Sequence, residues 1–239
     1  MKITSINNPK VAYWAKLKMK KYRDVEHLFI VESENLVNEA LKKGIVKEII
    51  TTEDKEYKVD TYNVTPEIMA KISSLVTPNK VMAVCNFILP DDIKGNVLLL
   101  DHIQDPGNLG TIIRSCVGFD VDTLVLGDTC VDLYNDKVLR ASEGNIFKLD
   151  IVRMDLKDVM KTLKEKDIVI YGTDVNDGEN IDKVENNSSF ALVMGNEGNG
   201  VSDEVKALVD KNLYIKTSKK LESLNVGVAT GIILYELNK

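Results

Sequence analysis

The stretch "FALVMGNEGNGVSDEV", residues 190–205, decides the fold. Its apolar start predicts a buried strand, its glycines and asparagines predict a turn, and its end has the periodicity of a helix. The same order of strand, loop and helix recurs through residues 97–239. This alternation predicts an α/β domain built on a parallel sheet.

Apolar runs and helical periodicities alternate on both sides of this stretch. The predicted strands are 97–103, 123–127, 167–175, 190–195 and 212–217. The predicted helices are 109–119, 136–144, 202–210 and 223–237. The run "VLLLDHI" at 97–103 is almost entirely apolar, as expected of a strand buried on both faces of a parallel sheet.

Residues 1–88 predict a smaller α/β unit. An amphipathic helix is expected over 9–22, and its inner face carries Val11, Trp14, Ala15, Leu17 and Met19. Other helices are expected at 34–44 and from about Pro66, and strands are expected at 27–33, 46–52 and 81–87. We therefore expect a first domain at 1–88, a polar linker at 89–96 and a second domain at 97–239.

The composition argues against a membrane protein. The 239 residues are 44% hydrophobic and 28% charged, and no run approaches the roughly 18 apolar residues of a membrane span. The first ten residues lack the apolar core of a signal peptide. Cys85, Cys116 and Cys130 are widely spaced, so we expect a reducing cytoplasm and no structural zinc.

Two histidines, His27 and His102, lie far apart in the sequence. They lack the spacing of metal ligands, and no Ser-His-Asp or Cys-His pattern can be built from them. We therefore expect each to be a packed or surface histidine, and we expect no metal site.

The formal net charge of −6 is unevenly distributed. Residues 1–90 hold 14 Lys or Arg against 11 Asp or Glu, a balance of +3, whereas residues 97–239 hold 16 against 24, a balance of −8. The first 23 residues contain seven basic side chains and no acidic one, namely Lys2, Lys10, Lys16, Lys18, Lys20, Lys21 and Arg23. This block is either a surface that binds nucleic-acid phosphates or a solvated helix face.

The glycine-rich loop at 195–200 raises the question of a phosphate site. Its spacing, G-x-x-G-x-G, matches neither a dinucleotide fold nor a P-loop, and no lysine directly follows it. Glu197 inside the loop would also repel a phosphate. Because glycines permit close approach to backbone N–H and C=O groups, the loop suits a neutral, planar ligand such as adenine.

Polar residues follow several predicted strands, at the edge where α/β sheets bind ligands. They are Asp105, Asn108 and Arg114 after the first strand, Thr173 and Asp174, Asn196 and Glu197, and Ser223 and Asn225 before the last helix. Taken one at a time, each of these polar residues is more readily explained as structural, and we expect Ser223 to cap the last helix.

Three segments, in this order, resemble the motifs of the SpoU (TrmH-type) branch of the SPOUT RNA methyltransferases. They are "DHIQDPGNLGTIIRSC" (101–116), "LVMGNEGNGVS" (192–202) and "ESLNVGVATGIILYE" (222–236). The first 88 residues, chiefly "FIVESENLVNEAL" (29–41), resemble a small substrate-binding domain similar to ribosomal protein L30e. The resemblance implies a trefoil knot, an exception to the rule that chains do not thread loops.

The resemblance also implies an activity, a cofactor and a site. Members of the family transfer a methyl group from S-adenosylmethionine to a ribose 2′-oxygen in RNA, here rRNA in preference to tRNA. By matching position, the cofactor-binding residues are Thr173, Met194, Gly195, Asn196, Gly200, Ile215 and Leu224. The catalytic residues are Asn108, Arg114, Glu197, Ser223 and Asn225, and the RNA-binding residues are Lys10, Lys16, Lys18, Lys20, Lys21 and Arg23.

The resemblance further implies a homodimer, in which the last helix and the first-motif helix pack across the two-fold axis. Arg114 either binds a phosphate beside the target ribose or acts as the base. A guanidinium with a pKa above roughly 12 is a poor base, which favours phosphate binding. Arg140 also matches a family position, for RNA contact or for folding of its turn.

The sequence departs from the family at a few positions. Lys216, Thr217 and Lys219 replace the usual Pro-Met pair and glycine, Gly227 replaces a serine, and Ser33 replaces a glycine. The leading hypothesis is an RNA ribose 2′-O-methyltransferase. An inactive RNA-binding protein of the same fold, acting in ribosome assembly, is the alternative, whereas a nucleotide-binding oxidoreductase lacks its glycine fingerprint.

Overall fold

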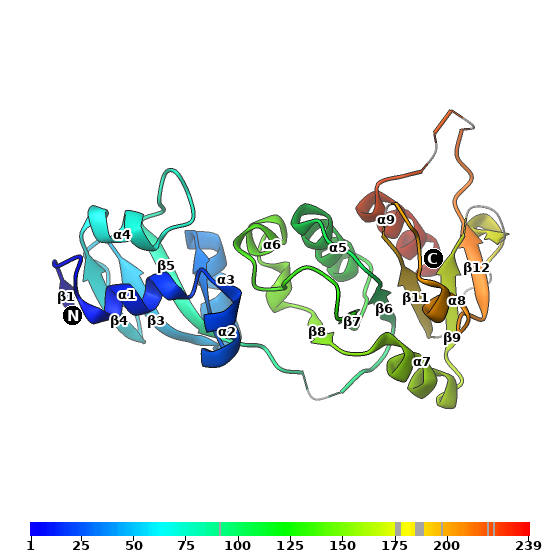
Figure 1. Ribbon diagram of the computed structural model, residues 1–239, viewed down its shortest axis with the longest axis horizontal. Coiled ribbons are helices and arrows are strands. Elements are labelled where there is room, and N and C mark those ends of the chain that lie inside the picture. Colours follow the sequence, from blue (N-terminus) through cyan, green and yellow to red (C-terminus); the bar gives the residue numbers. More distant parts are fainter. Residues whose placement is uncertain (91, 175–177, 185–188, 197, 219, 222) are drawn as a thin grey trace. The chain divides into compact units, whose positions relative to one another are not determined.

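The structure is a computed structural model that describes residues 1–90, 92–174, 178–184, 189–196, 198–218, 220–221 and 223–239. It divides into two compact units (Figure 1). The first unit comprises Met1–Ile88 and Asp132–Phe147, and the second comprises Leu89–Val131 and Lys148–Lys239. The first unit is therefore built from two separate segments of the chain.

The first unit is a mixed sheet covered by helices. Its strands are β1 (Lys2–Ile3), β2 (Leu28–Glu32), β3 (Val46–Thr51), β4 (Asp60–Val64) and β5 (Val81–Asn86), in the order β1-β4-β3-β5-β2. Its helices are α1 (Pro9–Lys16), α2 (Lys20–Glu26), α3 (Glu34–Lys43), α4 (Pro66–Ile72), α6 (Asp136–Ala141) and the 3-10 turn η1 (Asn145–Phe147). Strand β3 runs parallel to β4 and antiparallel to β5.

One face of this sheet carries an apolar core beneath α1 and α4. Trp14 is fully buried there, its ring lies edge-on to Tyr62, and its indole N–H donates to a carboxylate oxygen of Glu48 at 2.8 Å. The indole thus satisfies its polar atom while it fills the core. The buried members of this core are Val11, Trp14, Leu17, Leu28, Ile50, Tyr62, Val64, Ile68, Met69, Ile72, Met82 and Val84.

The prediction of a single helix over 9–22 was wrong, because the structure has two helices there, α1 and α2. Val11, Trp14 and Leu17 are buried as expected, but Met19 is 46% exposed. The guanidinium of Arg23 donates from Nη1 to the carbonyls of Leu17 and Lys18, at 2.9 and 2.7 Å. These two carbonyls lie in the break, so Arg23 supplies hydrogen bonds that a continuous helix would have made internally.

Tyr134 holds the segment 132–147 in the first unit. Its ring stacks on Phe29 and on Phe87, with centroid distances of 4.3 and 4.2 Å. Its hydroxyl accepts from the amide of Ile88 at 2.9 Å. The ring is 7% exposed, and burial raises the pKa of Tyr134 to about 12.

The second unit is a parallel sheet. Its strands are β6 (Val97–Leu100), β7 (Thr123–Leu126), β8 (Asp150–Arg153), β9 (Val169–Thr173), β10 (Glu179–Asn180), β11 (Phe190–Met194) and β12 (Lys211–Tyr214), in the order β10-β12-β9-β11-β6-β7-β8. Each pairing between these strands is parallel. Its helices are α5 (Pro106–Gly118), α7 (Leu156–Glu165), α8 (Asp203–Lys206), α9 (Val226–Leu237) and the 3-10 turn η2 (Ile181–Lys183).

Helices cover both faces of this sheet. Helices α7 and α8 pack with alternate strand residues, among them Val97, Leu99 and Val193, whereas α5 packs against α9. All four residues of β6 are fully buried, as the apolar run predicted. The α/β fold and its parallel sheet are confirmed.

Some elements of the second unit differ from the expectation. Strand β8 and helix α7 were not expected, although α7 buries Leu156, Val159, Met160 and Leu163 at helical spacing. The final helix begins at Val226, and its cap is Asn225 rather than Ser223. Asn225 accepts through Oδ1 from the amides of Gly227 and Val228, at 3.0 and 3.3 Å, and so the helix is capped two residues later than expected.

Candidate active site

The candidate site lies where the loops after β6 and β11 meet. These strands are neighbours in parallel register, with Met194 opposite Leu100. The amide of Asp101 donates to the carbonyl of Met194 at 2.9 Å, and the side-chain amide of Asn196 donates to the carbonyl of His102 at 3.1 Å. Strand β6 pairs with β7 on one side and with β11 on the other, so the loops meet at a switch point of the sheet, where α/β folds bind ligands.

The glycine-rich loop is a tight turn that closes on itself. The amide of Asn196 donates to the carbonyl of Gly200 at 3.0 Å, and the amide of Gly200 donates back at 2.8 Å. A Cβ on Gly195 would lie 2.2 Å from the carbonyl carbon of Gly200. Only glycine fits at 195, because the two arms of the turn approach each other there.

The turn is open beside Gly200. Gly200 has a φ of +69°, and no atom of the described residues beyond its chain neighbours lies within 4 Å of the position that its Cβ would take. The Asn196 side chain accepts from the amide of Gly198 at 2.9 Å, which fixes the tip. The loop thus presents backbone groups and no charge among its described residues, and this fits the neutral adenosine part of a nucleoside ligand. Glu197, which the resemblance assigned to catalysis, lies outside the described residues.

Asp101 anchors the turn, and the sequence reasoning did not identify it. Its side chain is 4% exposed, its Oδ2 accepts from the amide of Ser202 at 2.7 Å, and its Oδ1 lies 2.5 Å from Nδ1 of His102. His102 has a φ of +60° and a half-exposed ring. Asp101 could have been found from the sequence, because it is a polar residue directly after a fully apolar strand at the switch point.

A second group of polar residues lies at the N-terminal ends of α5 and α9. Asp105 caps α5 by accepting from the amide of Asn108 at 2.8 Å. The side-chain amide of Asn225 donates to Oδ1 of Asn108 at 2.8 Å. The helices approach closely beyond this bond, since a Cβ on Gly227 would lie 3.0 Å from Thr111. The structure thus brings together Asn108 and Asn225, which are 117 positions apart in the sequence.

The other predicted residues of the second unit lie as follows. Arg114 is exposed on α5, and Ser223 is exposed in the segment that leads into α9. Thr173 is half-buried at the end of β9, Ile215 is half-buried directly after β12, and Leu224 is half-buried before α9. Met194, the last residue of β11, is 3% exposed.

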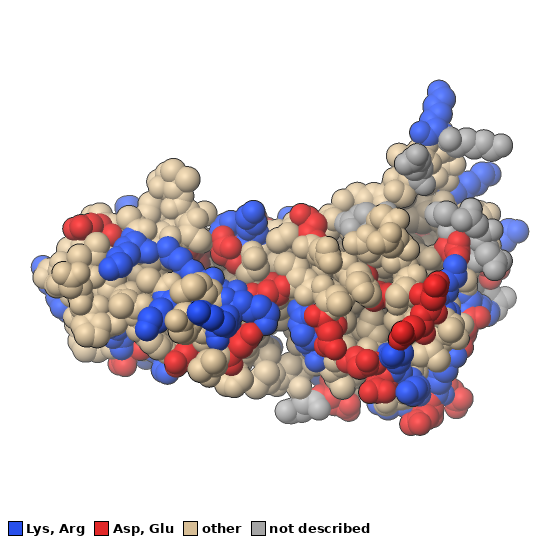
Figure 2. Space-filling model, in the orientation of Figure 1, with Lys and Arg blue, Asp and Glu red and all other residues tan. Residues whose placement is uncertain are grey.

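Basic side chains gather over α1 and α2 of the first unit (Figure 2). Lys16, Lys18, Lys20 and Lys21 are exposed. The ammonium group of Lys18 donates to the carbonyl of Ser73 at 2.6 Å, and that of Lys20 pairs with Asp24 at 2.5 Å. The Lys20–Asp24 pair is solvent-exposed, and such a surface ion pair exchanges readily with a partner because it is worth about 0–1 kcal/mol.

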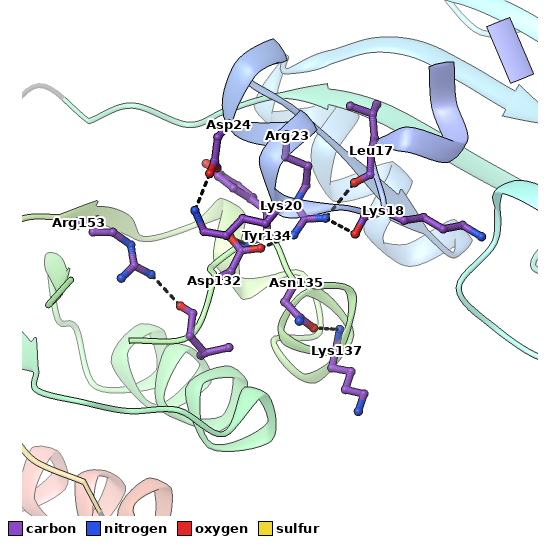
Figure 3. Close-up of polar contacts among 11 residues, drawn as sticks. Leu17, Lys18, Lys20, Arg23, Asp24, Asp132, Tyr134, Asn135, Lys137 and Arg153 are labelled. Carbon is purple, nitrogen blue, oxygen red and sulfur yellow. Dashed lines mark hydrogen bonds and ion pairs between the residues drawn. The ribbon is translucent and has the colours of Figure 1, made fainter. Parts of the chain in front are cut away.

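Lys10 and Arg23 are engaged inside the first unit. Lys10 donates to Glu48 and Tyr62 at 2.9 and 2.7 Å. Burial opposes its charge, but these bonds outweigh burial and raise the pKa of Lys10. Arg23 is 6% exposed and pairs with Asp132, as Figure 3 shows. Its Nε is buried without a partner among the described residues, which costs about 1–3 kcal/mol or more for a charged group.

No helix in the described part of the chain has the length and apolar character needed to cross a membrane. Among the same residues, no three His, Cys, Asp or Glu side chains group in a way that could hold a metal ion. Cys85 and Cys116 are fully buried, and burial raises the pKa of both thiols.

Comparison with known proteins covers nearly the whole chain. Residues 95–235 match the model of the SpoU rRNA Methylase family, and residues 8–83 match that of the MRM3-like substrate binding domain. The chain is 38% identical over 245 residues to the 23S rRNA (guanosine(2553)-2′-O)-methyltransferase RlmP of Bacillus subtilis, covering 98% of each protein.

Solved structures agree with these matches. A TrmH-family protein from Porphyromonas gingivalis superposes with a TM-score of 0.89 at 29% identity and covers 98% of both chains. An AdoMet-bound rRNA methyltransferase from Sinorhizobium meliloti has the same fold, with a TM-score of 0.91 at 24% identity, covering 99% of this chain and 97% of that one. The resemblance drawn from the three motifs is confirmed. With a family model over more than half of its length and a relative aligned end to end, the chain belongs to the SpoU rRNA methylase family.

Proposed function

We propose that this protein transfers a methyl group from S-adenosylmethionine to a ribose 2′-hydroxyl of ribosomal RNA. The observation that carries the proposal is the closed turn Gly195–Gly200, set at the switch point of a sheet whose family methylates rRNA. The relative from Bacillus subtilis, whose name states 23S rRNA as its substrate, favours rRNA over tRNA.

The turn and its neighbours form the proposed cofactor site. In this proposal the backbone around Met194, Gly195, Asn196 and Gly200 lies against the adenosine. Thr173, Ile215 and Leu224 complete this site by their family positions. The bound cofactor supplies an electrophilic methyl group on a positively charged sulfur. The described part of the turn adds no anionic side chain, so it holds the cofactor through hydrogen bonds and contact.

The chain's own residues orient the ribose hydroxyl. Asn108 and Asn225, joined by their hydrogen bond, position polar groups at the adjoining ends of α5 and α9. Ser223 stands two residues before this cap, and Glu197 lies in the turn by sequence. Most of the rate enhancement should come from holding the hydroxyl oxygen in line with the methyl group.

Arg114 is assigned to phosphate binding. Its side chain is exposed on α5, so an RNA strand can reach it. A guanidinium can hold a phosphate through two hydrogen bonds and stabilise negative charge that develops on the 2′-oxygen. Its high pKa makes it a poor acceptor of the hydroxyl proton.

The first unit is proposed to bind the RNA. Lys16, Lys18, Lys20 and Lys21 supply exposed positive charge for backbone phosphates. Lys10 and Arg23, which the sequence grouped with them, act on RNA indirectly in this proposal, since their charges hold the unit together. The proposed location is the cytoplasm, where ribosomal RNA is available.

A homodimer and a trefoil knot complete the proposal. Helix α9 carries an exposed apolar stripe of Val228, Ile232 and Tyr235, at 50%, 37% and 52% exposure. The spacing places these residues on one face of the helix, and a second copy of the chain would cover them. Ile232→Glu should then convert a sedimenting dimer to a monomer. The knot rests on family membership alone.

Calorimetry with S-adenosylmethionine tests the cofactor, and mapping of 2′-O-methylated riboses in rRNA from cells with and without the gene tests the reaction. One lost methylation site in the absence of the gene is expected. Absence of cofactor binding at millimolar concentration would favour the alternative, an inactive RNA-binding protein of the same fold in ribosome assembly. The altered residues Lys216 and Thr217 are the observation behind that alternative.

A further inference from the structure

Tyr22 places an aromatic ring within the lysine-rich surface of the first unit. Tyr22 and Lys21 lie on α2, and Lys16 is the last residue of α1. The ammonium nitrogens of Lys16 and Lys21 lie 5.6 and 4.9 Å from the centroid of the Tyr22 ring. Both distances lie within the roughly 6 Å over which a ring attracts a cation. The break between the two helices thus brings a lysine from each helix to one aromatic ring.

The two lysines at this ring have no acidic partner among the described residues. The acidic side chains of α2 are engaged elsewhere. Asp24 pairs with another lysine at 2.5 Å, and Glu26 accepts from the hydroxyl of Tyr13 at 3.1 Å. Lys16 and Lys21 are both exposed. An anion can therefore bind these two ammonium groups without breaking an ion pair.

The ring remains accessible with both lysines in place. Tyr22 is half-buried, so part of its surface meets solvent. Val25 lies three positions further along α2 and is 74% exposed. Residues three apart on a helix are neighbours on its surface. An exposed valine is ordinary by itself, but beside Tyr22 it extends the apolar surface that the lysines surround.

This combination of charge and aromatic surface selects among the forms of RNA. A phosphate needs only the lysines, and it would leave the ring unused. An unpaired nucleotide offers a phosphate for a lysine and a base whose face stacks on an aromatic ring. In a duplex the neighbouring bases cover these faces, so a base in a duplex cannot stack on Tyr22. Exposed cation–π contacts are weak, so the lysines can turn from the ring to the phosphates as a base takes their place.

We propose that Tyr22 stacks on an unpaired base of the RNA substrate while Lys16 and Lys21 hold the adjoining phosphates. The inference rests on RNA as the substrate proposed above. It assigns this surface of the first unit to a single-stranded stretch of that RNA, whereas lysines alone would accept a duplex equally well. Every base has a face that can stack, so the contact selects unpaired RNA and not a particular sequence.

The test measures binding of two hexamers to the full-length protein at low salt, one of adenosine and one of abasic ribose-phosphate. The two hexamers carry the same phosphates and differ only in the bases. We expect the adenosine hexamer to bind roughly tenfold more tightly. Tyr22→Leu should remove this preference and leave the affinity for the abasic hexamer unchanged, and Tyr22→Phe should retain the preference. Lys16→Gln should weaken the binding of both hexamers alike, because it removes a phosphate contact.

Tyr57→Leu is the matched control. Tyr57 is another half-buried tyrosine of the first unit, and the ammonium nitrogen of Lys55 lies 5.2 Å from its ring centroid. Lys55 is paired with Glu34 at 3.4 Å, so this ring lacks the unpaired cations found at Tyr22. Tyr57→Leu should therefore keep the preference for adenosine. Tyr22→Gln, which suits an exposed helix, takes the place of Tyr22→Leu if the leucine variant does not fold.

Equal affinity of the unmodified protein for both hexamers would overturn the stacking contact and leave a surface that binds phosphates alone. A preference that persists in folded Tyr22→Leu or Tyr22→Gln protein would overturn it as well. Methylation of rRNA by the unmodified protein is measured in parallel. Equal hexamer affinities with intact methylation remove the stacking contact alone, whereas absence of methylation removes the proposed function.

Discussion

The side-chain amide of Asn225 donates to Oδ1 of Asn108 across 2.8 Å, and Oδ1 of Asn225 caps α9. One side chain therefore starts a helix and ties it to the start of α5. Asn225→Asp keeps an oxygen that can cap the helix but loses the donor to Asn108. Asn225→Ala loses both functions.

We therefore expect Asn225→Asp to keep most of its stability while methyl transfer falls on the order of 100-fold, since small displacements of positioning groups cost about that much. Asn225→Ala should show the same loss of rate and, in addition, lose about 1 kcal/mol of unfolding free energy with its cap. Thermal unfolding and single-turnover methylation measure the two effects. Full activity of the Asp variant would remove the link to Asn108 from the site.

Arg114→Ala should abolish methyl transfer and leave cofactor affinity nearly unchanged, because the exposed side chain is assigned to the RNA phosphate. Arg114→Lys keeps the charge but loses the bidentate fork, so it should recover part of the rate. Calorimetry with S-adenosylmethionine and a methylation assay give the two readings. If the Ala variant no longer bound the cofactor, Arg114 would belong to the cofactor site instead.

Gly195→Ala should destroy cofactor binding. The new methyl carbon would lie 2.2 Å from backbone of Gly200, so the turn must open. Gly198→Ala is the matched control, because its Cβ would meet one side-chain oxygen at an ordinary 3.4 Å. Calorimetry should find binding in the control and none in Gly195→Ala. Equal binding in both variants would show that the closed turn is dispensable.

Charge reversal at Lys16, Lys20 and Lys21 should weaken RNA binding and flatten its salt dependence. Each phosphate contact that is lost should lower the slope of log K against log salt by about 0.7–0.9. Lys161→Glu, an exposed lysine on α7 of the acidic second unit, is the control. If the slope of log K against log salt were unchanged in the triple variant, these lysines would form a solvated helix face and not an RNA-binding surface.

The raised pKa of Tyr134 predicts how the stability of the protein changes at alkaline pH. Its folded pKa of about 12 lies above the ordinary 10.0, because burial disfavours the phenolate. The stabilisation is complete below pH 10 and is lost as the pH rises towards 12. The linkage amounts to about 2–3 kcal/mol. Tyr134→Phe should remove this part of the pH dependence, which urea unfolding at pH 9 to 12 would measure. If the free energy of unfolding changed equally with pH in the unmodified protein and in Tyr134→Phe, the role of Tyr134 would be contradicted.

The sequence predicted the central strands of the second unit because their burial on both faces makes them almost purely apolar. It also predicted the end of α3 at Gly44, which adopts a φ of +76°. The short strand β1 escaped notice, since its pairing partner β4 lies far away in the chain. Strand β4 escaped notice as well. The break between α1 and α2 escaped notice because it depends on Arg23 and not on a proline or glycine.

The candidate site could be predicted from the sequence motifs, but not from its residues taken one at a time. Asn108 and Asn225 look like two unrelated helix caps until the fold joins them. Asp101 carried a weak signal, because a carboxylate after a strand is common and its contact with Ser202 spans 101 positions. Ser33 shows the reverse case: its φ of 129° explains why the family position usually holds glycine.

The contact between Arg23 and Asp132 has a consequence for synthesis of the protein on the ribosome. Its two residues are 109 positions apart, and Tyr134 fills the space between Phe29 and Phe87. A nascent chain that has just released its first 88 residues cannot bury Phe29 and Phe87 as the finished protein does. The first unit must wait for residues 132–147 to emerge, so part of the second unit is translated before the first has finished folding.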